Sequence, residues 1–239
     1  MRIDITLPAY GWEPRRHQRR AWSYLEHGGK HAELIWHRRA GKDDIALRHA
    51  ANQAMIRPAN YWHMLPLGVQ VRKAIWNAVN PHTKRKRIDE AFPHVLRKTT
   101  REQEMMIEFI NGSTWQALGS DNFENHIGSS PAGIVFSEWA QADPRARGFL
   151  RPILLENNGW QLYITTPRGK NHAYKTYQSA LKNPYAYAEL LTVEDTGVFT
   201  AEQMADELQA YIDDYGEDFG KSFFEQEYFC SFNAAISFW

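Results

Sequence analysis

The sequence contains one cysteine, no long apolar run and no net charge, and each of these features narrows the class of protein. Because Cys230 is alone, no disulfide can form within the chain, and the composition is typical of a reducing compartment. No apolar run reaches the length of about 18 residues that a membrane-spanning helix needs. The first residues also lack the apolar core of a signal peptide. We therefore expect a soluble, cytoplasmic protein.

The charges balance over the whole chain but not locally. Lysine and arginine together number 28, as do aspartate and glutamate, so no overall field attracts nucleic acid or an anionic membrane. Any such binding must come from local patches. The clearest are RRHQRR at 15–20 and HTKRKR at 82–87. A short basic run is more often a solvated surface than a phosphate contact, and the sequence leaves both interpretations open.

Short apolar runs alternate with helical patterns along the first part of the chain, without internal repeats or low-complexity segments. The helical patterns cover 43–56 and 68–79. The Asn111-Gly112 pair separates two alternating runs and predicts a β-hairpin. The other apolar runs, interpreted as strands, are 31–37, 61–65, 132–140 and 160–169. This alternation predicts an α/β fold with a mostly parallel sheet, helices on both faces and a ligand site at the carboxyl ends of the strands.

The pattern changes beyond about residue 180. Thr200 followed by Gln203 is a signature of a helix N-terminus, and an acidic amphipathic segment follows. A second segment, 219–229, is rich in aromatic residues. We therefore assign residues 1–180 to a core and residues 181–239 to a small, mostly helical lid or linker.

Residues 36–44, WHRRAGKDD, are close to the phosphate-binding pattern G-x-x-x-x-G-K-[ST]. Gly41 and Lys42 are in place, but Trp36 stands at the first glycine and Asp43 replaces the hydroxyl residue. In such a loop, backbone amides and a helix N-terminus face the phosphates while the lysine reaches their outer oxygens. An ordinary strand-to-helix turn is the alternative, because Gly-Lys often begins a helix.

The strand GIVFSEWA carries departures that complement those of the loop. In ATPases that carry a phosphate-binding loop, a second strand supplies an aspartate to the magnesium shell and then a glutamate that polarises the attacking water. Glu138 occupies the glutamate position, whereas Ser137 stands at the aspartate position. We hypothesise that Asp43 and Ser137 have exchanged roles around one Mg²⁺, directly or through water, since Mg²⁺ accepts one carboxylate with waters and phosphate oxygens. Alternatively, Asp43 only caps the helix and Ser137 fills a site that binds metal poorly.

A third motif, ITTPRG, ends a strand that we expect beside the other two. The hydroxyls of Thr165 and Thr166 can hydrogen-bond a γ-phosphate or its water network, and so report hydrolysis to the rest of the protein. The alternative is a simple turn, because Thr-Pro often ends a strand.

Taken in order, the motifs resemble the ATPase part of the large terminase subunit of tailed bacteriophages, the motor that packages DNA into a prohead. The segments that carry the resemblance are PRRHQ, HRRAGKD, NGSTWQALGSD, IVFSEWA and YITTPRGKNH. Each segment is weak alone, but the ordered set is specific and runs over nearly the whole chain. The resemblance implies a RecA-like P-loop NTPase of the ASCE class, with Walker A and Walker B motifs and a small helical lid.

The resemblance also implies roles for individual residues. Glu138 matches the catalytic glutamate, and Thr165 and Thr166 match the coupling motif that links hydrolysis to lid movement. Arg38 stands where some terminases place an arginine that helps neutralise the transferring phosphate, and Gln18 is similar to a glutamine that reads the adenine edge. The implied nucleotide-binding set is Gln18, His37, Arg38, Arg39, Ala40, Gly41, Lys42 and Asp43.

One position departs from the family. Many terminases carry an arginine before the Walker B strand that acts on the neighbouring subunit, whereas this chain has His126 near that place. Arg101, Arg145 and Arg147 are then the candidates for an intersubunit finger.

The resemblance implies ATP and Mg²⁺ as cofactors. The implied partners are double-stranded DNA, a portal protein and the small terminase subunit, in a homo-oligomeric ring at the prohead portal in the host cytoplasm. In isolation we expect a monomer with weak ATPase activity. The family's large subunit continues into a nuclease domain of the ribonuclease H type, and this chain stops near the expected linker, so we expect no DNA cleavage by it.

Two other functions stay open. A superfamily 2 helicase fragment would share the early glutamine, the loop and the acidic strand, but it would need a second RecA domain. A non-catalytic DNA-binding or assembly module on a decayed P-loop fold is suggested by the residues at 43 and 137.

Overall fold

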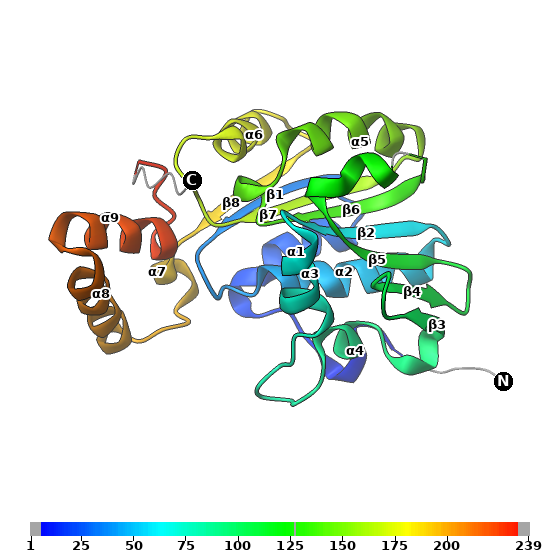
Figure 1. The fold of residues 1–239 in the computed structure, drawn as a ribbon, viewed down its shortest axis with the longest axis horizontal. Helices are drawn as coiled ribbons and strands as arrows, with labels where there is room; N and C mark the ends of the chain where they lie inside the picture. The colour runs from blue at the N-terminus through cyan, green and yellow to red at the C-terminus, as the bar shows by residue number, and fades with distance from the viewer. Residues whose placement is uncertain (1–5, 127, 234–239) are drawn as a thin grey trace.

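The computed structural model describes residues 6–126 and 128–233, which are built around one eight-stranded sheet (Figure 1). The strand order is β3-β4-β5-β2-β6-β7-β1-β8. The strands are β1 (His31–Trp36), β2 (Asn60–Leu65), β3 (Arg97–Arg101), β4 (Met106–Phe109), β5 (Thr114–Gly119), β6 (Pro131–Ser137), β7 (Trp160–Thr165) and β8 (Tyr187–Leu191). Only β4 pairs with its neighbours in antiparallel fashion; the other pairs are parallel. The predicted mostly parallel sheet is confirmed.

Helices cover both faces of the sheet, as the alternating pattern predicted. In Figure 1, α1 to α4 lie below the sheet, and α5 and α6 lie above it. Their bounds, with those of the remaining helices, are α1 (Arg19–Glu26), α2 (Lys42–Ile56), α3 (Gly68–Val71), α4 (Arg87–Ala91), α5 (Pro144–Glu156), α6 (His172–Leu181), α7 (Val193–Thr196), α8 (Ala201–Tyr215) and α9 (Glu217–Tyr228). None of the helices within the described residues is long and apolar enough to cross a membrane.

Two apolar clusters fill the two sides of the sheet, because successive side chains of a strand point to opposite faces. On β2, Tyr61 and Leu65 belong to the cluster under α2, whereas Trp62 and Met64 belong to the cluster under α5. Burial on both faces explains why the strands read as continuous apolar runs rather than as alternating ones. The sheet therefore holds the carboxyl ends of its strands in fixed positions.

Two local predictions had different outcomes. Asn111-Gly112 does connect the antiparallel strands β4 and β5, and Gly112 has a φ of 87°. The helical stretch expected over 68–79 is present over residues 68–76, but only α3 (Gly68–Val71) is α-helical, and a π-helical turn follows over Arg72–Trp76. The turn brings Trp76 into the core, where its ring stacks on Trp115 at 6.3 Å between centroids.

The C-terminal part forms a helical unit beside the sheet edge. Strand β8 pairs with β1, so the sheet continues beyond residue 180, where the core was expected to end. The helices α8 and α9 pack against each other through a cluster that includes Phe224 and Tyr228. The predicted cap of α8 is present, since the Thr200 hydroxyl accepts a hydrogen bond of 3.2 Å from the Gln203 amide. We call α7, α8 and α9 the lid.

Candidate nucleotide site

The loop between β1 and α2 makes a tight turn into the helix. Gly41 immediately precedes α2 with a φ of 83°, which a residue with a Cβ rarely adopts. A Cβ at this position would lie 2.6 Å from Nε2 of Gln18. The same Nε2 donates hydrogen bonds of 3.2 Å to the carbonyls of Ala40 and Gly41. Glycine is therefore required both by the turn and by the close approach of the glutamine.

Gln18 is fully buried beneath the loop, and its amide supports the loop backbone. His17 adds a hydrogen bond of 2.9 Å to the carbonyl of Ala40. The predicted contact of Gln18 with an adenine edge stays a prediction, whereas its contact with the loop is a feature that the sequence did not reveal.

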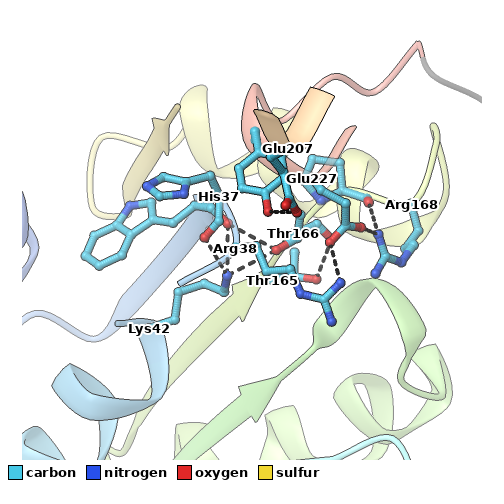
Figure 2. Close-up of polar contacts among 11 residues, drawn as sticks. His37, Arg38, Lys42, Thr165, Thr166, Arg168, Glu207 and Glu227 are labelled. Atoms are coloured by element: carbon cyan, nitrogen blue, oxygen red, sulfur yellow. Dashed lines mark hydrogen bonds and ion pairs between the residues drawn. The ribbon is translucent and has the colours of Figure 1, made fainter. Parts of the chain in front are cut away.

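The ammonium group of Lys42 makes three hydrogen bonds inside the site (Figure 2). Its Nζ donates to the carbonyl of Trp36 at 2.9 Å, to the carbonyl of His37 at 3.1 Å and to the hydroxyl of Thr166 at 3.1 Å. Lys42 is 7% exposed, so this cation is held among oxygen acceptors in a largely buried position. It lies at the first position of a 15-residue helix, where free amides also favour anions.

Asp43 and Ser137 are in direct contact. The Ser137 hydroxyl donates a hydrogen bond of 2.7 Å to Oδ1 of Asp43, and His63 of β2 donates to the same oxygen from 3.1 Å. Burial opposes ionisation of Asp43, but the hydrogen bonds from His63 and Ser137 outweigh it and lower its pKa to about 2. The two residues that depart from the usual motifs thus form one pair of oxygen donors beside Lys42.

Glu138 follows β6 in a left-handed backbone conformation, with a φ of 51° and a ψ of 43°. Such a conformation is costly for a residue other than glycine, and it persists only where its surroundings enforce it. Burial raises the pKa of Glu138, the charge of Lys42 lowers it, and the charge of Asp43 raises it again. The charges of Lys42 and Asp43 therefore both act on the Glu138 carboxyl, and its catalytic role stays a prediction.

The turn after Glu138 is fixed by residues at the start of α6 and by Thr165 at the end of β7. The Ala140 amide donates to Thr165 Oγ1 at 3.1 Å, and the Asn171 amide group donates to the Ala140 carbonyl at 2.7 Å. His172 Nε2 lies 2.7 Å from the carbonyl of Trp139. Asn171 and His172 were missed as site residues, although Asn171 is recognisable in sequence as the cap of a helix.

Thr165 and Thr166 connect the two halves of the site. Thr165 contacts the turn after Glu138, whereas the hydroxyl of Thr166 donates to the Trp36 carbonyl at 3.2 Å and accepts from Lys42. Their strand, β7, pairs with both β1 and β6, as predicted. The two adjacent threonines therefore join the turn after Glu138 to the side chain of Lys42.

The lid is tied to the loop by a buried carboxylate that the sequence did not reveal. Glu227 of α9 is 1% exposed and accepts a hydrogen bond of 3.0 Å from Arg38 Nη1 (Figure 2). Its other oxygen is bound by Arg168, which lies two residues after Thr166. The Arg38 amide also donates to the Glu227 carbonyl at 2.9 Å. One carboxylate of the lid thus holds two arginines from two different motifs.

His37 supplies a second tie between the loop and the lid. Its Nε2 lies 2.7 Å from the hydroxyl of Thr196 in α7, and its amide donates to the Leu191 carbonyl at 3.0 Å. Burial lowers the pKa of His37 to about 4, with a further contribution from the charge of Lys42. The ring is therefore neutral near pH 7, and it is held by the lid rather than exposed in the loop.

The candidates for an intersubunit arginine are all engaged locally. Arg101 pairs with Glu104 at 3.3 Å on the outermost strand, and Arg145 pairs with Asp143 at 2.7 Å. Arg147 donates to the hydroxyl of Tyr163 at 3.0 Å. Their action on a neighbouring subunit stays a prediction, as does any role of His126, whose ring lies 5.8 Å from that of Trp62.

A cleft of about 480 Å³ lies at the same sheet edge, next to the turn after Glu138 rather than over Lys42. Its lining residues are Pro66, Leu67, Gln70, Asp121, Gln141, Ala142 and Asp143. The cleft therefore does not coincide with the cluster of Lys42, Asp43 and Ser137 described above.

The eight-stranded, mostly parallel sheet with helices on both faces defines an α/β fold of the class that the sequence predicted. Solved structures agree with this class. The chain is similar to the ATPase domain of the large terminase of Thermus phage P74-26, with 18% identity, a TM-score of 0.71 and coverage of 93% of this chain and 95% of that one. The chain thus has the fold of phage large terminase ATPase domains, which confirms the predicted resemblance at the level of fold.

Two further structures support the same fold. A large terminase from a thermophilic bacteriophage, solved in complex with ADP, shares 14% identity and a TM-score of 0.67. The match covers 92% of this chain and 54% of that one, so the chain spans about half the length of that terminase. The N-terminal domain of the DNA packaging ATPase from bacteriophage phi29 shares 12% identity and a TM-score of 0.50, with coverage of 77% of this chain and 97% of that one.

No protein-family model matches the sequence. No curated protein matches it either.

Proposed function

We propose that this chain is the ATPase part of a phage large terminase, which hydrolyses ATP with Mg²⁺ and drives double-stranded DNA into a prohead. The observation that carries the proposal is the hydrogen bond of 2.7 Å between Ser137 and Asp43, next to the buried Lys42. It brings the two unusual residues of the motifs to one point at the carboxyl ends of β1 and β6. The terminase fold supports the same conclusion, as do the ADP and ATP-γ-S complexes of the similar terminase from a thermophilic bacteriophage.

The donor set fits Mg²⁺. Asp43 is ionised at neutral pH because its pKa lies at about 2, and Ser137 adds a neutral oxygen beside it. One carboxylate, one hydroxyl, waters and phosphate oxygens make up the hard oxygen set that Mg²⁺ prefers. When bound, Mg²⁺ would neutralise charge on the phosphate oxygens during transfer. Asp43 and Ser137 would hold it, each directly or through water.

The other residues of the site have roles that follow from their contacts. Lys42 exchanges its carbonyl acceptors for phosphate oxygens, which attract an ammonium group more strongly than neutral carbonyls do. Glu138 orients the attacking water and takes up its proton, and burial of this carboxyl raises its pKa towards the working range of a general base. Nucleotide contacts of Arg38, Arg39 and Ala40 are part of this proposal, whereas the ring of His37 is held by Thr196 of α7.

Thr165 and Thr166 would carry the chemical event to the lid. Thr166 touches Lys42, and Arg168, two residues further on, binds the lid residue Glu227. A shift of the threonines on loss of the γ-phosphate therefore acts on a segment that contacts the lid directly. In this proposal the assembled ring transmits that movement to DNA, with the portal and the small terminase subunit as partners.

ATPase measurements on the isolated chain test the proposal. We expect weak but measurable Mg²⁺-dependent hydrolysis, because a site that needs a neighbour's charge is incomplete in a monomer. Lys42→Ala and Glu138→Gln should each remove this activity. Lys30→Ala is the matched control, since Lys30 lies at the amino end of β1, where its Nζ donates to the Asn158 carbonyl at 2.8 Å.

The same measurement decides between the ATPase and a non-catalytic DNA-binding or assembly module. The module is favoured by the loss of the usual hydroxyl and aspartate at positions 43 and 137. If the wild-type protein is no faster than Lys42→Ala and Glu138→Gln at saturating Mg²⁺ and ATP, the module is the better interpretation.

A further inference from the structure

The segment between the π-helical turn and α4 presents a compact basic loop, which we define as residues 79–86. An isolated antiparallel bridge joins Val79 to Lys86, and the Asn80 amide donates to the Arg85 carbonyl at 2.8 Å. The Lys84 amide closes the tip by donating to the Asn80 carbonyl at 2.8 Å. The loop therefore has a defined hairpin-like backbone rather than an irregular one.

A buried carboxylate beneath the loop holds it in place. Glu90 of α4 is 5% exposed, and its carboxylate accepts hydrogen bonds from Thr83 and, at 3.3 Å, from the side chain of Asn80. Arg48 of α2 lies 3.7 Å from the same carboxylate and also binds the Glu90 carbonyl. The loop is thus anchored to the helix that begins at Lys42.

The acidic groups near the basic loop are engaged by arginines outside it, whereas the cations at its tip are not engaged by carboxylates. Asp89 pairs with Arg97 at 2.6 Å, and Glu90 is engaged by Arg48 and the loop itself. In the part of the chain that the structure describes, Lys84, Arg85 and Lys86 form no ion pair with a carboxylate. Lys84 and Arg85 are exposed, and Arg85 stacks on the exposed ring of Tyr10 at 4.2 Å from its centroid.

A surface with these properties fits a polyanion with regularly spaced charges. An overall neutral chain has no general attraction for nucleic acid, so its contacts must come from a local patch of unpaired cations. Three neighbouring cations on a fixed backbone lose little conformational freedom on binding, because the loop is already ordered by Glu90. The anchoring helix α2 also belongs to the nucleotide site.

We propose that the basic loop, through Lys84, Arg85 and Lys86, contacts the phosphate backbone of double-stranded DNA. The choice of double-stranded DNA as the partner rests on the proposed function. The inference adds the surface of this chain that contacts the DNA. Contacts of this kind go to phosphates and carry no base sequence, which suits a protein that must move along any duplex.

Fluorescence anisotropy with the whole chain and a labelled duplex of about 30 base pairs tests the inference. Replacing Lys84, Arg85 and Lys86 together by alanine should weaken binding by about tenfold or more and reduce the slope of log K against log salt by about 2 to 3. The matched control replaces Lys170, Lys175 and Lys182 of the α6 region by alanine. It removes the same charge from the opposite face of the sheet and should bind nearly as the wild type does.

A second variant tests the anchoring without changing the charge. Thr83→Val removes the hydroxyl that donates a hydrogen bond to Glu90 and accepts one from the Arg85 amide, while residue 83 is exposed and the side chain keeps its shape. Without this hydrogen bond the free loop is less ordered and loses more conformational entropy on binding. The affinity for DNA should therefore fall by about two- to tenfold, whereas the slope of log K against log salt should not change.

Two outcomes would overturn the inference. One is equal binding by the loop variant and the control variant, and the other is undetectable binding of the wild type at about 50 mM salt. ATP hydrolysis without DNA is measured on the same preparations and should not differ between the loop variant and the wild type. If the protein hydrolyses ATP and the loop variant still binds DNA as the wild type does, the DNA surface proposed here is wrong but the ATPase function stands. If the protein does not hydrolyse ATP and the loop variant loses DNA binding, the ATPase function is wrong but the DNA surface stands.

Discussion

The Ser137 hydroxyl donates a hydrogen bond of 2.7 Å to Oδ1 of Asp43. These residues come from β6 and from the first turn of α2, and they are 94 positions apart in the sequence. Each carries the functional group that the usual motif would place at the other's position. Because the two groups are in contact, a metal ion at this point would have the same two ligands, one carboxylate and one hydroxyl. The carboxylate would come from the helix and the hydroxyl from the strand, the reverse of the usual arrangement.

A reciprocal swap is the sharpest test of this exchange. Asp43→Ser and Ser137→Asp, made singly, should each lower kcat/KM for Mg-ATP by about 10- to 100-fold, the usual cost of disturbing a metal shell. The double variant restores one carboxylate and one hydroxyl in the usual order, and we expect it to regain at least about tenfold over either single variant. Steady-state ATPase rates over a Mg²⁺ titration measure the effect. Simple additivity of the two losses would count against a shared metal site.

Because Asp43 is ionised in the folded protein, we expect the free energy of unfolding to depend on pH. Its folded-state pKa is lowered from 3.8 to about 2, with the hydrogen bond from His63 as the main stabilising cause against burial. The resulting contribution to the free energy of unfolding is fully present above about pH 5 and is lost as the pH falls towards 2. It is at most about 2 kcal/mol, because the Asp43 side chain is 24% exposed.

Urea unfolding of the wild type and Asp43→Asn measures this contribution. The difference in unfolding free energy between the two proteins should be largest at pH 7 and should shrink at pH 3. A difference that stays constant between these pH values would show that the Asp43 carboxylate is not stabilised as the contacts with His63 and Ser137 require.

The features that sequence reasoning predicted are those with a local signal. Gly41 and Lys42 are adjacent in a recognisable pattern, and the buried strands are continuous apolar runs. The contact between Arg38 and Glu227 joins positions 189 apart, and nothing near either residue indicates the partner. Gln18 was singled out by resemblance, but its hydrogen bonds to the loop depend on how α1 packs against α2. The π-helical turn was missed because its residues have ordinary helical propensity.

The two glycines with similar backbone angles allow the Gln18 contact to be measured. Gly41 and Gly112 have φ values of 83° and 87°, but an added Cβ meets Gln18 only at position 41, since nothing lies within 4 Å at position 112. Gly112→Ala should therefore cost about 1 kcal/mol of stability from backbone strain alone. Gly41→Ala should cost about 1 kcal/mol more and should also abolish ATP binding. Chemical denaturation and titration with a fluorescent ATP analogue provide the two readings, and equal costs for the two variants would contradict the close packing of Gln18.

From the contacts of Glu227 we expect the lid to influence the affinity for ATP. Its carboxylate engages Arg38 and Arg168, two cations that belong to the loop before α2 and to the segment after Thr166. A triphosphate that recruits these arginines must compete with Glu227, so Glu227→Gln should tighten ATP binding. A loss of about 1 kcal/mol of competing interaction corresponds to about a fivefold lower Kd. The Arg38 side chain is 57% exposed, which limits the effect to this order.

Titration of a fluorescent ATP analogue, with limited proteolysis of the lid in parallel, checks this expectation. The matched control is Glu225→Gln, which removes the same charge from an exposed position of α9 and should change neither reading. Glu227→Gln should also make the lid more susceptible to protease, because Arg38 and Arg168 hold α9 through this carboxylate. If Glu227→Gln instead weakens ATP binding while the lid stays protected, the carboxylate orders the two arginines for the nucleotide rather than competing with it.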